Sequence, residues 1–241
     1  MNAMKTITLL ITFLLSPSAS ADWWETFPTA EAYLDFLYDR PFHDGDASIE
    51  TDWTDNVNGI THDSDDWYLT QKRTIFRIPL SVPLDQSLRT HGQVQYRQLD
   101  SYPSLTGYGH FGDVTYYEYG GTRVVLVPVD KGGDVDSGLP ALLMVVRADS
   151  TLEELNTVPF PGQAPASTPN HQGQAGFVMV DPEGRIYSAT NSGECLDGTF
   201  SCLRIYEANW DRLGSDDFEL VPASPPELRL RDRKGDPILI Q

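Results

Sequence analysis

Three stretches of the chain repeat one order of parts, and this repetition constrains the fold more than any single residue does. Each stretch begins at a glycine, continues into a short apolar strand, turns at Asp, Gly or Pro, and returns as a strand rich in Tyr, Val and Leu. The three starting glycines are Gly59, Gly112 and Gly176. Because such repetition is typical of architectures built from similar β units, the sequence predicts an all-β fold.

Each repeat is expected to supply three strands separated by turns. The nine expected strands cover residues 59–62, 67–70, 74–78, 112–116, 123–127, 141–146, 176–180, 185–188 and 203–206. Earlier in the chain, apolar and aromatic residues recur at helical spacing over residues 30–38, which predicts one short amphipathic helix.

The order of parts over residues 56–210 resembles a β-propeller of the broad kind found in secreted bacterial repeat proteins. No WD dipeptide closes a blade and no kelch double glycine is in register, so the resemblance indicates no specific family. Propellers typically have four to eight blades, whereas three units are recognisable here. The resemblance therefore implies that the termini, including the apolar residues 237–241, complete a small fourth blade, or that the chain is a shortened relative. A β-sandwich is the alternative fold.

The N-terminus predicts export. Lys5 precedes an apolar run at residues 7–15, and Ala19-Ser20-Ala21 forms an A-x-A cleavage signature. We expect residues 1–21 to be removed as a signal peptide, residues 22–55 to form the helix and a linker, and residues 56–241 to form the β domain. The apolar run is shorter than the roughly 20 residues that span a bilayer, so no membrane span is predicted. The expected location is the periplasm or the cell exterior.

The cysteine count and the charge agree with that location. The chain has two cysteines, Cys195 and Cys202, and in an oxidising compartment they predict a local disulfide. The chain also carries 17 basic and 35 acidic side chains, a formal charge of −18. Nucleic acids and anionic membrane surfaces would repel such a chain. The acidic excess serves solubility or holds Ca²⁺, and composition does not separate the two.

Polar residues next to the aligned glycines are the candidates for a binding site. In a propeller the innermost strands line a central channel, so groups near their starts would converge at its mouth. These candidates are Asn58, His110, Asp113 and Gln174. Their alternative role is to hydrogen-bond neighbouring units. Secreted propeller enzymes such as the calcium-dependent lactonases and phytases bind metal at this mouth, but the resemblance carries none of their ligand positions onto this chain.

The densest acidic turn offers a second kind of site. Asp63, Asp65 and Asp66 could supply oxygen ligands to Ca²⁺, the one cofactor that the sequence suggests, although their spacing does not match the D-x-[DN]-x-[DN]-G loop. Solvated turn residues are the alternative interpretation.

No motif identifies a reaction. The five histidines lack HExxH-type spacing, and GxSxG, SxxK and P-loop motifs are absent. The leading hypothesis is therefore an exported, non-catalytic module that binds an unknown small molecule or protein. A calcium-assisted hydrolase of the lactonase or phosphatase type is the alternative, followed by a shortened inactive relative.

Overall fold

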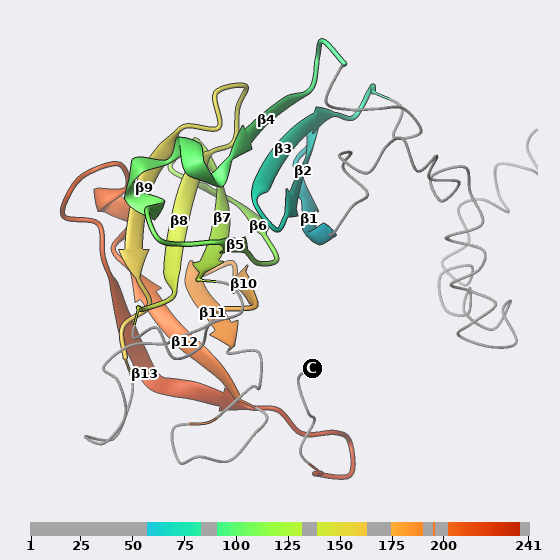
Figure 1. Ribbon diagram of the computed structural model, residues 1–241. Helices are drawn as coiled ribbons and strands as arrows, with labels where there is room; N and C mark the ends of the chain where they lie inside the picture. The colour runs from blue at the N-terminus through green and yellow to red at the C-terminus, as the bar shows by residue number, and fades with distance from the viewer. Residues whose placement is uncertain are drawn as a thin grey trace, which may run out of the picture. The chain divides into compact units, whose positions relative to one another are not determined.

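The described part of the protein is built from β-strands. The computed structural model describes residues 57–82, 91–131, 139–162, 175–189, 195 and 202–236, all within the unit Ile49–Gln241. These residues form three antiparallel sheets and no α-helix, which confirms the all-β prediction (Figure 1). None of the three sheets closes on itself. The expected helix over residues 30–38 and the predicted signal peptide lie outside the described residues.

The first sheet pairs its four strands in chain order. They are β1 (Val57–His62), β2 (Asp66–Gln71), β3 (Thr74–Pro79) and β4 (Gln95–Gln98). The two middle strands are the most apolar, and their side chains are mostly buried. Two short 3-10 helices follow β4, at Leu99–Ser101 and Pro103–Leu105.

The second sheet contains five strands. They are β5 (His110–Phe111), β6 (Thr115–Tyr119), β7 (Thr122–Asp130), β8 (Leu142–Arg147) and β9 (Glu154–Pro159). Strands β6 to β9 pair in chain order, and β5 pairs with the end of β7. The expected strand over residues 112–116 is therefore wrong at its start, because the backbone N–H of Asp113 leaves the sheet and donates to the carbonyl of Gly176.

The third sheet again pairs in chain order. Its strands are β10 (Phe177–Val180), β11 (Arg185–Ala189), β12 (Cys202–Ala208) and β13 (Leu220–Arg229). A 3-10 helix, Trp210–Arg212, lies between the last two. The edge strand β13 contains Pro222, Pro225 and Pro226. Proline has no backbone N–H, so an edge strand, which pairs on one side only, tolerates it best.

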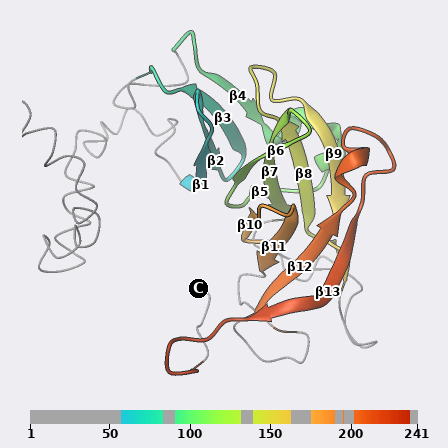
Figure 2. The same ribbon diagram turned by 180° about the vertical axis from the view of Figure 1, so that it is seen from behind.

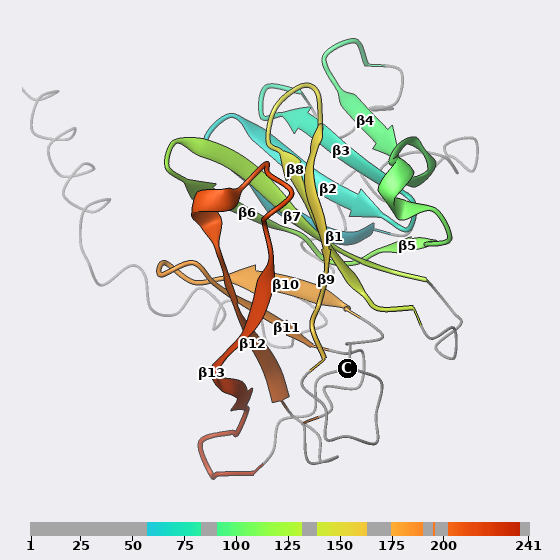
Figure 3. The same cartoon turned by 90° about the vertical axis from the view of Figure 1, so that its left-hand side faces the viewer.

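The core consists of two layers, one on each face of the second sheet. On β7, Val125 and Val127 face the first sheet and the 3-10 helices, whereas Val124 and Leu126 face the third sheet. Because both faces of β7 and β8 are covered, these strands are continuous apolar runs and do not alternate with polar residues. Figures 2 and 3 show the second sheet between the other two.

Candidate functional site

The three sheets meet at the glycines that begin the three repeats. A Cβ atom on Gly59 would lie 2.0 Å from Oδ1 and 2.5 Å from Cα of Asp113. One on Gly112 would lie 2.6 Å from the carbonyl oxygen of Gly176. Strand β6 contacts both β1 and β10 (Figure 1). The glycines therefore permit a backbone approach that any side chain would prevent.

Asp113 connects all three sheets. Its backbone N–H donates to Gly176 O at 2.9 Å, and it pairs with Phe177 in a parallel bridge. Its carboxylate accepts the N–H of Val114 at 2.8 Å and lies against Gly59 on β1. Desolvation among the converging strands raises the pKa of the Asp113 carboxyl, and backbone N–H groups limit the rise. The residue is nevertheless exposed, and it forms no ion pair within the described part of the chain.

Asn58 and His110 form a second link between the first two sheets. The Asn58 amide Nδ2 donates to Phe111 O at 2.7 Å and lies 3.3 Å from His110 Nε2. On the other side of the ring, His110 Nδ1 lies 3.3 Å from Oδ1 of the buried Asp130. Nε2 can accept from Asn58 when the ring carries its proton on Nδ1, but Nδ1 itself makes no hydrogen bond to the described residues, so its contact with Asp130 is one of proximity.

The structure thus brings together three of the four predicted binding residues. Asn58, His110 and Asp113 all bond groups on a neighbouring sheet, which is the linking role considered above. Ligand binding by these residues stays a prediction, and Gln174 lies outside the described residues. Asp130 was not recognised as the partner of His110, since only the pairing of β5 with β7 brings them together.

The turn with Asp63, Asp65 and Asp66, predicted as a possible metal site, is stabilised by hydrogen bonds and by ion pairs with arginines. Asp63 Oδ1 accepts the backbone N–H groups of Asp65 and Asp66, both at 2.8 Å. Arg123 lies 3.2 Å from carboxylate oxygens of Asp63 and Asp65, and Arg77 lies 2.8 Å from Asp66. Calcium at this turn would have to displace cations that are already in place, so the turn serves at least to join β1–β2 to β7.

The third sheet contains an equivalent turn that the sequence analysis did not single out. Asp181 Oδ1 accepts the backbone N–H of Arg185 at 2.8 Å, and its Oδ2 accepts the hydroxyl of Tyr187 at 2.9 Å. Tyr68 donates to Asp63 in the corresponding way. Desolvation opposes ionisation of Asp181, but the bonds from Arg185 and Tyr187 hold the pKa of its carboxyl below the ordinary value. In both hairpins an aspartate opens the turn and a tyrosine on the returning strand donates to it.

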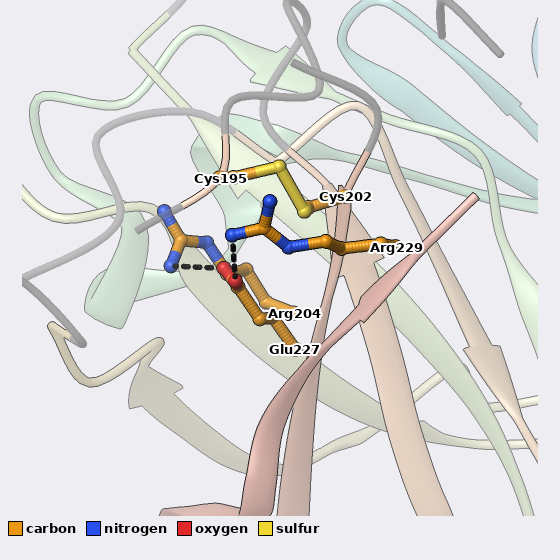
Figure 4. Close-up of a disulfide and its surroundings, with 5 residues drawn as sticks. All are labelled: Cys195, Cys202, Arg204, Glu227 and Arg229. Carbon is orange, nitrogen blue, oxygen red and sulfur yellow. Dashed lines mark hydrogen bonds and ion pairs between the residues drawn. A yellow bond between two sulfur atoms is a disulfide. The ribbon is translucent and has the colours of Figure 1, made fainter. Parts of the chain in front are cut away.

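The predicted disulfide between Cys195 and Cys202 is confirmed, and Figure 4 shows its surroundings. Glu227 lies close to both sulfurs. Among the described residues, Cys195, Cys202 and Glu227 are the only group of three or more His, Cys, Asp or Glu side chains close enough together to hold one metal ion. Both sulfurs are oxidised, so neither is available as a thiolate ligand. Glu227 instead pairs with Arg204 at 3.8 Å and with Arg229 at 3.4 Å, which ties β12 to β13.

No helix in the described ranges is long and apolar enough to cross a membrane. No protein-family model matches the chain, and no curated protein is significantly similar to it in sequence.

Proposed function

We propose that this protein is an exported, β-propeller-like binding module whose partner docks where the three sheets meet. Three antiparallel sheets, each with four strands paired in chain order, and contacts of β6 with both β1 and β10 support an arrangement of adjacent blades. The disulfide fits an oxidising compartment outside the cytoplasm. Both features support the proposal, and neither identifies the partner.

The observation that carries the proposal is the pair of exposed apolar side chains on the inner strands. Ile60 on β1 is 48% exposed and Met179 on β10 is 49% exposed. Ile60 directly follows Gly59, which lies against the Asp113 carboxylate, and Met179 lies two residues after Phe177, the bridge partner of Asp113. Exposed apolar side chains next to such a junction between sheets support a contact surface there.

Site-specific crosslinking tests this proposal. A photoreactive phenylalanine analogue replaces Ile60 or Met179, and a control replaces Val221 on β13, which is 43% exposed. After irradiation of the exported protein in its native medium, we expect a discrete crosslinked product from the two inner-strand positions. The same products from Val221, or none from any position, would refute a partner site at the junction.

Calcium binding would distinguish the alternative function, a calcium-assisted hydrolase, from a binding module. The observation in its favour is that the carboxylate of Asp113 and the amide of Asn58 both lie at the starts of inner strands. A ligand at 100 times its dissociation constant stabilises the native state by about 2.7 kcal/mol. Thermal unfolding with Ca²⁺ and with EDTA should then differ visibly, and Asp113→Asn should abolish the difference. Identical melting curves would remove this alternative.

A further inference from the structure

A single amide nitrogen connects β1 to two groups on β5. Nδ2 of Asn58 donates to the carbonyl of Phe111 at 2.7 Å and lies 3.3 Å from Nε2 of His110. A carbonyl oxygen only accepts hydrogen bonds, so the first contact fixes which end of the amide faces β5. The two N–H groups of this nitrogen can then serve both acceptors, provided that Nε2 of His110 carries no proton.

Protonation of His110 is incompatible with this arrangement. An imidazolium has N–H groups on both ring nitrogens, so Nε2–H would face the N–H of Asn58. Turning the amide round would present its oxygen to Nε2, but the Phe111 carbonyl would then lose its donor and face an oxygen. No orientation of the amide satisfies both partners, so the contact between Asn58 and His110 exists only while the ring is neutral.

The other side of the ring favours the proton. Nδ1 of His110 is buried and lies 3.3 Å from Oδ1 of Asp130 on β7, although it makes no hydrogen bond to the described residues. The Asp130 side chain is only 6% exposed, and a nearby carboxylate stabilises the charged form of an imidazole. Asn58 and Asp130 therefore act on His110 in opposite directions.

Other charged groups surround β5 but do not switch in the same way. Among the described residues, Asp130 is the only carboxylate within ion-pair distance of the His110 ring. The β2–β3 turn and the end of β7 also border β5. Together with the segment that follows β5, they carry three cations and one carboxylate: Lys72, Arg73, Lys131 and Asp113. The cations oppose a charge on the ring and stay charged throughout the range in which histidine titrates.

We infer that His110 is a pH-sensitive link between the first two sheets. With the ring neutral, Asn58 joins β1 to β5. With the ring protonated, His110 is attracted to Asp130 on β7 and its contact with Asn58 is broken, so acid loosens the junction on the side of the first sheet. The inference does not depend on the proposed binding function, because no partner takes part in it.

NMR of the wild-type protein tests this link directly. The histidine ring signals are followed between about pH 8 and pH 5, and His110→Gln identifies the His110 signal by its loss. The side-chain amide signals of Asn58 should shift with the same midpoint as the His110 ring, and in His110→Gln they should not. The amide of Asn156, which bonds backbone groups of residues 214–215, is the internal control and should not follow His110.

Substitutions on the two sides of the ring should move this midpoint in opposite directions. Asn58→Ala removes the group that requires a neutral Nε2, so the midpoint should rise by about 0.5–1 pH unit. Asp130→Asn removes the attracting charge and should lower the midpoint, whereas Asn156→Ala, the matched amide substitution, should leave it unchanged. The destabilisation by Asn58→Ala in urea should also shrink as the pH falls through the midpoint, because acid has already broken the contact.

An Asn58 amide that does not titrate with His110 would overturn the inference. So would a midpoint that Asn58→Ala leaves unchanged or lowers. If Asn58→Ala does not fold, the titration of the wild-type amide decides alone.

Discussion

Replacing Gly112 by alanine tests whether the close approach of the second and third sheets holds the fold together. The added Cβ would lie 2.6 Å from Gly176 O and 2.8 Å from Ala175 O, whereas ordinary contact begins at 3.4 Å. The obstructing atoms are backbone, so the sheets would have to separate by about 0.8 Å, and overpacking of this kind costs about 1–3 kcal/mol. The separation also lengthens the hydrogen bond from Asp113 N to Gly176 O, now 2.9 Å, at a further cost of about 1 kcal/mol.

We therefore expect Gly112→Ala to lower the free energy of unfolding by about 2–4 kcal/mol and the melting temperature by about 10 °C. Urea unfolding followed by circular dichroism measures the change. The slope of the unfolding free energy against urea concentration should be the same as in the wild type. Gly92→Ala is the matched control, because nothing lies within 4 Å of its added Cβ, and it should be neutral or stabilising by up to about 1 kcal/mol. A loss below about 0.5 kcal/mol at Gly112, or an equal loss at Gly92, would refute the reasoning.

Three further predictions concern the turns and the disulfide. Asp63→Asn should destabilise the protein by about 2 kcal/mol, because its buried carboxylate accepts two N–H groups and an arginine, whereas the exposed Asp65→Asn should cost at most about 0.5 kcal/mol in the same urea titration. Asp181 has a lowered pKa, so its ionised form stabilises the native state above the unfolded-state pKa of about 3.9, and the stabilisation is lost as the pH falls through the native pKa. Wild-type and Asp181→Asn unfolding curves should thus differ at pH 7 and converge in acid; a constant difference would contradict this. Replacing Cys195 and Cys202 by serine should cost about 2.5 kcal/mol, and an unchanged unfolding midpoint would show that the crosslink constrains little.

The sequence predicted the inner three strands of each unit but not the fourth. Strands such as β2, β7 and β8 are apolar enough to be recognised without a structure. The fourth strands are edges: β4 is polar and partly exposed, β9 is half-buried up to its exposed last residue, and β13 is interrupted by prolines. A strand that buries little surface needs no apolar periodicity, so the sequence carries no strong signal for it.

In the candidate site, too, the sequence reveals features that depend on neighbouring residues but not contacts between residues that are far apart in the chain. The aligned glycines drew attention to Asn58, His110 and Asp113, because a close approach of two backbones requires glycine at a fixed position in the sequence. The partners of these residues could not be predicted. Asp130 reaches His110 through the β5–β7 ladder, and Arg123 reaches Asp63 across 60 residues of sequence, so both pairings depend on the arrangement of the sheets.

The prolines of β13 also restrict how this protein can assemble with others. An open sheet edge normally offers a row of N–H and C=O groups to which a foreign strand can add. Successive N–H groups of a strand point to opposite edges, so one of the adjacent prolines Pro225 and Pro226 removes a donor from the outer edge of the third sheet. A strand arriving there would find a gap in its hydrogen-bond ladder. Growth of the sheet into fibres or strand-exchanged aggregates is therefore disfavoured at this boundary.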